Sequence, residues 1–289
     1  MFSTLLEWQA SLPPWAADSW RYANGLLLLA LLFVPLERHF GERRQATLRK
    51  GWGIDVAWYF LTSLLPSRLL ALPVAALLWA LADLAPQGLW PALGELPGLP
   101  RFVLAMVVAE VGFYWGHRAM HASAVLWRFH AIHHSAGELD WLVNTRAHPV
   151  DWFLVRLCGL LPLYLLGLAQ PQRAAPDWVP LLVTLVGSLW GYLIHANLRW
   201  RFGKLEQLVA TPAFHHWHHQ DLGPGGRRHA NYAAFLPVLD RLFGTLHLPE
   251  DDWPQQYGTG APPLPTLVDQ LIAPFMGDAP GPRPRTGTG

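Results

Sequence analysis

The chain carries HRAMH at residues 117–121, HAIHH at residues 130–134 and HHWHH at residues 215–219, and these stretches hold nine of its 14 histidines. Side chains three or four positions apart lie on one face of a helix, so each stretch would present two or three imidazoles in one direction. Packed together without a metal, neutral imidazoles would leave ring nitrogens unsatisfied, and protonated ones would repel each other. The spacing therefore predicts helices that bind metal.

The composition is that of a membrane protein. Hydrophobic residues make up 52% of the 289 positions and charged residues 14%, against roughly 25% charged residues in a soluble domain. The net charge of +1 gives no reason to expect a nucleic acid partner, which requires a concentrated basic face. The one cysteine, Cys158, rules out an intramolecular disulfide and a C-x-x-C motif. We expect it to act as a small hydrophobic residue.

Hydropathy predicts five membrane spans, at residues 23–36, 67–85, 101–116, 152–169 and 178–194. Residues 52–65, which end before Pro66, are predicted to form an interfacial or broken segment. The loop after the first span is basic, with Arg38, Arg43, Arg44, Arg49 and Lys50, and the positive-inside rule places it in the cytoplasm. The N-terminus lacks the basic start of a secretory signal, so insertion would rely on internal spans.

This topology returns all the histidine stretches to one side of the membrane. The span at 101–116 leads to His117, and the span at 178–194 leads back to His195. If residues 52–85 crossed twice, the histidines would face away from the basic loop, so we favour a single crossing. The predicted fold is all-α: a polytopic helical membrane protein with a cytoplasmic cap of histidine-bearing helices.

We expect a single integral-membrane domain over residues 1–276, with a histidine-rich core at 109–247. Residues 277–289, GDAPGPRPRTGTG, lack large apolar side chains, and they are predicted to be disordered.

The motifs YWGHRAMH (114–121), FHAIHHS (129–135) and TPAFHHWHH (211–219) resemble the three histidine boxes of the fatty acid hydroxylase and sterol desaturase superfamily. Further matches follow in the family's order: RAHPVD (146–151), HAN (195–197), NY (231–232) and LPVLDRLFGT (236–245). The resemblance implies a membrane-embedded centre of two iron ions that uses O₂ and two electrons to attack an unactivated C–H bond of a lipid. Zinc has no redox chemistry, so activating O₂ needs a metal such as iron.

Carried onto this sequence, the resemblance implies that the metal ligands are His117, His121, His130, His133, His134, His215, His218 and His219, to which we add His195 at the end of the returning span. His216 would support a ligand or lie at the surface, and His148 would support the site through a hydrogen bond. The role of His229 stays open, and we expect His39 and His247 to be ordinary.

Other polar residues would orient this site. Ligating histidines usually donate their second ring N–H to an oxygen, and we expect two of Asp151, Asn197, Asn231 and Asp240 to accept such a bond. Glu110 and Tyr114 share a helical face with His117 and would support it or make structural hydrogen bonds. Thr211 and Pro212 are predicted to be the N-cap and first residue of the helix that carries the third box.

The expected activity is hydroxylation of a lipid from the bilayer, such as a sterol or fatty acyl lipid, with desaturation as the other outcome of the same chemistry. No G-x-G-x-x-G fingerprint follows a strand. Electrons would therefore come from a separate ferredoxin or cytochrome with its reductase, docking on cytoplasmic arginines that include Arg199, Arg201, Arg227 and Arg228.

The alternative is a membrane metal transporter or another histidine-rich metal-binding membrane protein. A transporter should hold its ligands at mid-membrane depth in broken helices. A bis-histidine haem protein would pair single histidines within spans, and a zinc hydrolase would carry H-E-x-x-H, which is not present in the sequence.

Overall fold

Long apolar runs form the helices that dominate the molecule. The computed structural model describes residues 8–9, 11–69, 76–77, 79–80, 89–169, 177–223, 229–250, 252–261 and 263–276. Its long helices are α2 (Pro14–Phe40), α3 (Trp52–Leu69), α6 (Gly98–Ala122), α8 (Pro149–Leu165) and α9 (Trp178–His195). These described residues form helices without any β-strand, so the predicted all-α fold is confirmed.

Short helices connect and flank the long ones. They are α5 (Leu89–Gly94), α7 (Ala124–His134), α10 (Pro212–His218), α11 (Val238–Leu242), α12 (Leu267–Ile272) and the 3-10 helices η2 (Trp141–Thr145) and η3 (Gly203–Gln207). Helices α7 and α10 carry the second and third histidine stretches.

Three of the described helices, α2, α6 and α9, are long and apolar enough to cross a membrane. They contain the predicted spans at 23–36, 101–116 and 178–194. Helix α8 begins near the predicted span at 152–169 but ends at Leu165 after 17 residues. Most of the predicted span at 67–85 lies outside the described residues, as do residues 277–289, so the five-span topology stays a prediction.

The predicted break at Pro66 is wrong, because α3 continues through this proline to Leu69. A proline removes one main-chain donor, and apolar helices tolerate the loss where neighbouring groups adjust.

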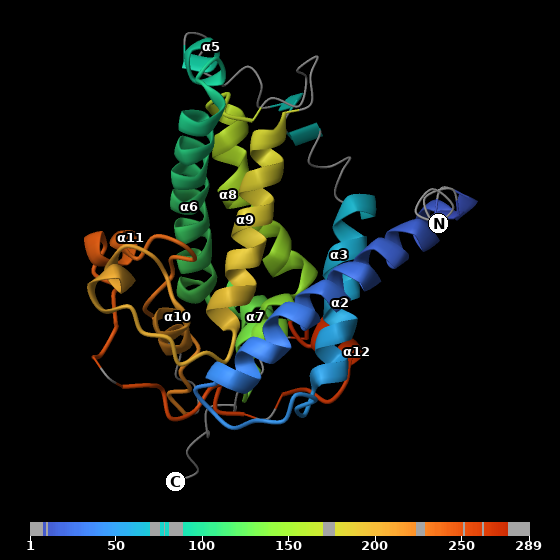
Figure 1. The fold of residues 1–289 in the computed structure, drawn as a ribbon, viewed down its shortest axis with the longest axis vertical. Coiled ribbons are helices and arrows are strands. Elements are labelled where there is room, and N and C mark those ends of the chain that lie inside the picture. The colour runs from blue at the N-terminus through green and yellow to red at the C-terminus, as the bar shows by residue number, and fades with distance from the viewer. Residues whose placement is uncertain are drawn as a thin grey trace.

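Helices α6, α8 and α9 run along the long axis of the molecule, and α6 packs against both of the others (Figure 1). Helices α7 and α10 lie at one end of this group, and α5 lies at the other (Figure 1). Helix α2 crosses the group obliquely. The histidine-bearing helices therefore gather at one end of the long apolar helices.

Glycines allow α6 and α8 to approach closely. A Cβ atom on Gly112 would lie 2.0 Å from the carbonyl oxygen of Cys158, and one on Gly116 would lie 2.8 Å from the Cys158 Cβ. Small residues allow the same close approach between helices in membranes.

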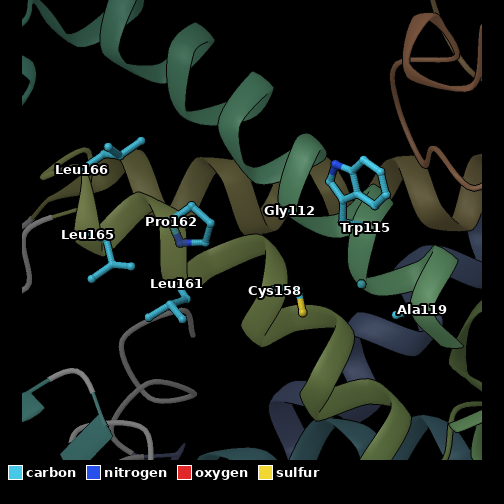
Figure 2. Close-up of a pocket in the computed structure, with 9 residues that line it drawn as sticks. Gly112, Trp115, Ala119, Cys158, Leu161, Pro162, Leu165 and Leu166 are labelled. Atoms are coloured by element: carbon cyan, nitrogen blue, oxygen red, sulfur yellow. The ribbon is translucent and has the colours of Figure 1, made fainter. Parts of the chain in front are cut away.

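An apolar groove of about 510 Å³ lies between α6 and α8 beside this contact, and Trp115, Cys158 and Leu165 line it (Figure 2). On α6 the lining residues are Gly112, Trp115, Gly116 and Ala119, which share one helical face. At about 100° per residue, His117 and His121 lie on roughly the opposite face. The groove therefore does not open directly onto the histidines.

Candidate metal centre

The ends of four helices deliver the histidines. His117 and His121 lie in the last turns of α6, and His195 is the last residue of α9. Ser123 caps α7 by accepting from the Leu126 N–H, and Thr211 caps α10 by accepting from the Phe214 N–H at 3.3 Å. The predicted N-cap at Thr211, with Pro212 next to it, is confirmed. The two caps fix where α7 and α10 begin, and therefore which helical face their histidines occupy.

The nine predicted ligands form two buried groups, and the candidate ligand atoms within each group lie within 4.8 Å of one another. The five-histidine cluster contains His117, His121, His130, His134 and His218. The four-histidine cluster contains His133, His195, His215 and His219. The structure therefore brings together side chains that lie as far apart in sequence as His117 and His218.

Within each cluster the Nε2 atoms point at one another. In the five-histidine cluster, the His130 Nε2 lies 3.0 Å from the Nε2 of His117 and 3.2 Å from that of His134. In the four-histidine cluster, the His195 Nε2 lies 3.2, 3.0 and 3.3 Å from those of His133, His215 and His219. A metal such as zinc binds imidazole nitrogen at about 2.0–2.1 Å, which places neighbouring nitrogens about 3.0–3.4 Å apart. The observed spacing fits shared coordination.

In four of the nine histidines the opposite ring nitrogen, Nδ1, contacts a main-chain carbonyl. His117 donates to the Tyr232 carbonyl at 2.8 Å and His133 to the Arg146 carbonyl at 3.1 Å. In the same way, His195 pairs with the Gly191 carbonyl and His218 with the Ala230 carbonyl. A carbonyl can only accept, so Nδ1 carries the proton and Nε2 keeps its lone pair. These contacts fix the tautomer that metal binding requires.

His130 has a carboxylate in place of a carbonyl. Its Nδ1 lies 3.0 Å from the Asp151 Oδ1, and both side chains are buried. Asp151 stands in the first turn of α8, and the helix is capped by His148, whose Nδ1 accepts from the Val150 N–H. The start of α8 thus orients a histidine on α7.

The donor set fits a metal ion. Burial keeps the pKa of His133, His134, His215 and His219 well below the ordinary imidazole value, and repulsion from neighbouring imidazoles adds to this effect. These rings are therefore neutral near pH 7. Among the described residues, both ring nitrogens of His121 are buried without a hydrogen-bond partner. Converging lone pairs cannot satisfy each other, and a cation between them would.

A buried charge network supports the four-histidine cluster. Asp55 accepts from Arg49 Nη2 and from Arg146 Nε, each at 2.6 Å, and Asp140 also accepts from Arg49. The Arg146 side chain also donates to Ser135 Oγ at 3.2 Å. The main-chain carbonyl of Arg146 is the one that holds His133. The network thereby ties α3 and η2 to the segment that orients a candidate ligand.

Comparisons with known proteins agree with this geometry. Residues 102–245, which include all nine histidines, match the family model described as fatty acid hydroxylase. The chain belongs to the fatty acid hydroxylase superfamily. No solved structure gives a significant match.

Several curated relatives match this fatty acid hydroxylase chain. The ornithine lipid hydroxylase OlsE of Rhizobium tropici is 37% identical over 64% of this chain and 53% of its own length. An alkylglycerol monooxygenase of Danio rerio is 33% identical over 52% of this chain and 31% of its own. The very-long-chain aldehyde decarbonylase GL1-7 of Oryza sativa subsp. japonica is 24% identical over 57% and 26%. The chain thus spans about half the length of these relatives or less.

The other histidines of this hydroxylase-family chain lie outside both clusters. His216 is buried rather than at the surface, and it contacts the Tyr257 hydroxyl at 2.8 Å and the Ala196 carbonyl at 3.1 Å. His148 also contacts the Leu271 carbonyl at 3.1 Å. His148 thus supports the site indirectly, because its hydrogen bond caps the helix whose first turn carries Asp151. His229 is exposed and contacts the Tyr232 hydroxyl.

Of the four predicted acceptors, Asp151 alone contacts an imidazole within the described residues. Asp240 instead accepts from the N–H groups of Tyr232 and Ala233, and Asn231 bonds to the Phe214 and His247 carbonyls. Both therefore shape the loop that supplies carbonyls to His117 and His218. The expectation of two direct acceptors is wrong, because main-chain oxygens, which a sequence cannot reveal, do most of this work.

The remaining predicted supports also act on the backbone. Asn197 pairs with the Arg43 main chain. Glu110 accepts from the N–H groups of Phe235 and Leu236, and the Tyr114 hydroxyl pairs with Thr245. The structural interpretation of Glu110 and Tyr114 is the one that the geometry bears out.

Proposed function

We propose that this protein is a membrane-bound, O₂-dependent oxidoreductase with two iron ions that hydroxylates a C–H bond of a lipid. The observation that carries the proposal is the pair of buried histidine clusters at the ends of apolar helices, inside a fatty acid hydroxylase domain. The five-histidine cluster would hold one iron and the four-histidine cluster the other. When bound, the iron pair would supply the two-electron chemistry that activates O₂.

The protein's own residues would prepare the site in three ways. The carbonyls of Tyr232, Arg146, Gly191 and Ala230, together with Asp151, hold the imidazoles in the tautomer that points Nε2 inward. Burial lowers the pKa of His133, His134, His215 and His219 and keeps these rings neutral, so that each offers a lone pair. The surrounding buried side chains exclude water from the reacting atoms.

The reactions for which two of the relatives are named favour hydroxylation over desaturation. Two of the relatives are called a hydroxylase and a monooxygenase. The substrate would be a membrane lipid that reaches the site from the bilayer.

The cytoplasmic placement of the site is supported by the basic loop at residues 38–50. The Arg43 N–H donates to the Asn197 Oδ1 at 3.0 Å, two residues beyond His195, so this loop and the clusters share one side of the molecule. Arg38, Arg44, Lys50 and Arg199 are exposed there. An acidic ferredoxin or cytochrome would dock on these charges.

Not every arginine expected in the docking surface is available for it. Arg201 pairs with Glu206 and with the Pro249 carbonyl. Arg49 is buried with Asp55. Arg227 and Arg228 lie outside the described residues.

The metal transporter alternative has no support. Its ligands should lie at mid-membrane depth, where broken helices can coordinate an ion. Here the candidate ligands stand in the last turns of α6, at the last residue of α9 and on the short helices beyond them.

The test is oxygen incorporation in cells supplied with oxygen-18 gas. Cells that express the wild type should contain a lipid that gains one labelled oxygen, and cells that express His134→Ala should not. His39→Ala, an exposed histidine outside both clusters, is the matched control and should behave as the wild type. A lipid that loses two hydrogens without gaining oxygen would indicate desaturation. An unchanged lipid profile, from protein that contains iron, would contradict the proposal.

A further inference from the structure

One arginine lies in the middle of an apolar helix. Arg156 stands in the α8 sequence PVDWFLVRLCGLLPLYL, with apolar residues on either side. A charged side chain inside a membrane segment is costly, and such residues usually face the protein interior and serve a function. The proposed mechanism gives Arg156 no role.

The guanidinium of Arg156 has few polar neighbours. Its Cζ lies 4.7 Å from the centre of the Trp152 ring, one turn earlier on α8. It also lies within electrostatic range of Tyr192 on α9. Within the described part of the chain it makes no hydrogen bond and no ion pair. An arginine has five N–H donors and no acceptor, so these donors lack the oxygen atoms that would satisfy them.

Arg156 lies on the face of α8 away from the groove of Figure 2. The α8 residues that line the groove of Figure 2 are Cys158, Leu161, Pro162 and Leu165. At about 100° per residue, Arg156 lies roughly opposite Cys158 and Leu165 on the helix. The residue is partly buried. Accessible surface therefore remains beside it.

Tyr192 provides a second polar group from the facing helix. Its hydroxyl makes no hydrogen bond to the described residues, and its ring packs near Phe33 and Trp141. Tyr192 stands three residues before His195, which is about 4.5 Å of helix rise. Arg156 stands five residues after Asp151, the partner of His130, or about 7.5 Å of rise. Both groups thus lie one to two turns from the metal clusters, on the side of the apolar helices.

We propose that Arg156, assisted by the Tyr192 hydroxyl, binds an acyl carbonyl or carboxylate oxygen of the lipid substrate. The guanidinium N–H groups and the Tyr192 hydroxyl would donate hydrogen bonds to this oxygen inside the membrane, where no water is present to do so. Binding there would place carbons a few bonds from the oxygen beside the clusters. The inference rests on the proposed function for the identity of the ligand as substrate, but the binding site itself is testable without turnover.

The test is equilibrium binding of three radiolabelled chains to the purified full-length protein in detergent: palmitate, methyl palmitate and hexadecane. The wild type should prefer palmitate and methyl palmitate to hexadecane. Arg156→Leu should lose about tenfold to a hundredfold of the affinity for palmitate, the range expected for hydrogen bonds to a charged group, and keep its affinity for hexadecane. Tyr192→Phe should show a smaller loss. A stronger effect on palmitate than on methyl palmitate would identify a carboxylate as the preferred ligand.

Two controls separate binding from folding. Arg21→Leu removes an exposed arginine whose side chain is 64% accessible, and it should bind all three chains as the wild type does. Arg156→Lys keeps the charge and should retain part of the palmitate affinity, even if Arg156→Leu folds poorly. The proposal is overturned if the wild type shows no preference for the oxygen-bearing chains, or if Arg156→Leu and Arg156→Lys both keep the wild-type preference. Metal content, measured in the same samples, reports on the proposed function independently.

Discussion

The imidazoles of the adjacent residues His133 and His134 are nearly perpendicular, with an interplanar angle of 89°, and they join different clusters. His218 and His219 repeat this relationship with an angle of 90°. Successive residues on a helix point about 100° apart, so an adjacent pair cannot converge on one point. The paired histidines of the second and third boxes therefore contribute one imidazole to each cluster.

The division into clusters predicts different losses for neighbouring substitutions. His133→Ala should empty the four-histidine cluster, because the three histidines that remain there should bind iron only weakly. The five-histidine cluster keeps all its ligands and should stay loaded. His134→Ala should do the reverse. Iron content per purified chain should fall from about two to about one in each variant and to nearly none in the double variant. If either single variant loses both ions, the clusters act as one unit.

Asp151→Ala should weaken metal binding at the five-histidine cluster. The substitution removes the acceptor 3.0 Å from the His130 Nδ1, and loss of such a partner typically costs 10–100-fold in metal affinity. Metal titration of apo-protein measures the effect. Glu138→Ala, an exposed acid a few residues beyond the second box, is the control, and its affinity should match that of the wild type. Equal affinity in Asp151→Ala would show that His130 needs no orientation.

Asp55→Ala should strongly destabilise the fold. Arg146 would keep only its bond to Ser135, while Arg49 would keep Asp140. Removing one partner of a buried ion pair costs about 3–5 kcal/mol, whereas Arg21→Ala, at an exposed pair, should cost less than about 1 kcal/mol. Thermal unfolding in detergent compares the two. Equal melting temperatures for both variants would show that the buried charge network does not stabilise the fold.

His216→Ala should separate stability from metal binding. The side chain bridges the Tyr257 hydroxyl and the Ala196 carbonyl and belongs to neither cluster. Its removal leaves buried polar groups unsatisfied, at a cost of about 1–3 kcal/mol. The melting temperature should fall while iron content stays at about two per chain. A loss of iron that matches His133→Ala would make His216 part of the ligand set.

The sequence indicated the composition of the candidate site because helical periodicity is local. The spacings within residues 117–121, 130–134 and 215–219 place imidazoles on common faces, and the end of a span delivers His195. The N-cap at Thr211 was predictable for the same reason, since capping depends on neighbouring residues.

The parts that escaped prediction depend on contacts between distant segments or on main-chain atoms. The carbonyls of Arg146 and Tyr232 that set the tautomers have no side-chain signature. The burial of Arg49 required knowledge that Asp55 and Asp140 meet it. The sequence does show Arg156 as the one charged residue in the apolar run at 152–169. It does not show which side chains surround the guanidinium.

The central claim is that each histidine cluster holds one redox-active metal ion. Anomalous diffraction from crystals of the iron-loaded protein, measured at the iron absorption edge, tests it most directly. Two peaks are expected, one among the Nε2 atoms of His130 and His134 and the other among those of His195 and His215. A single peak, or iron bound away from these nitrogens, would contradict it.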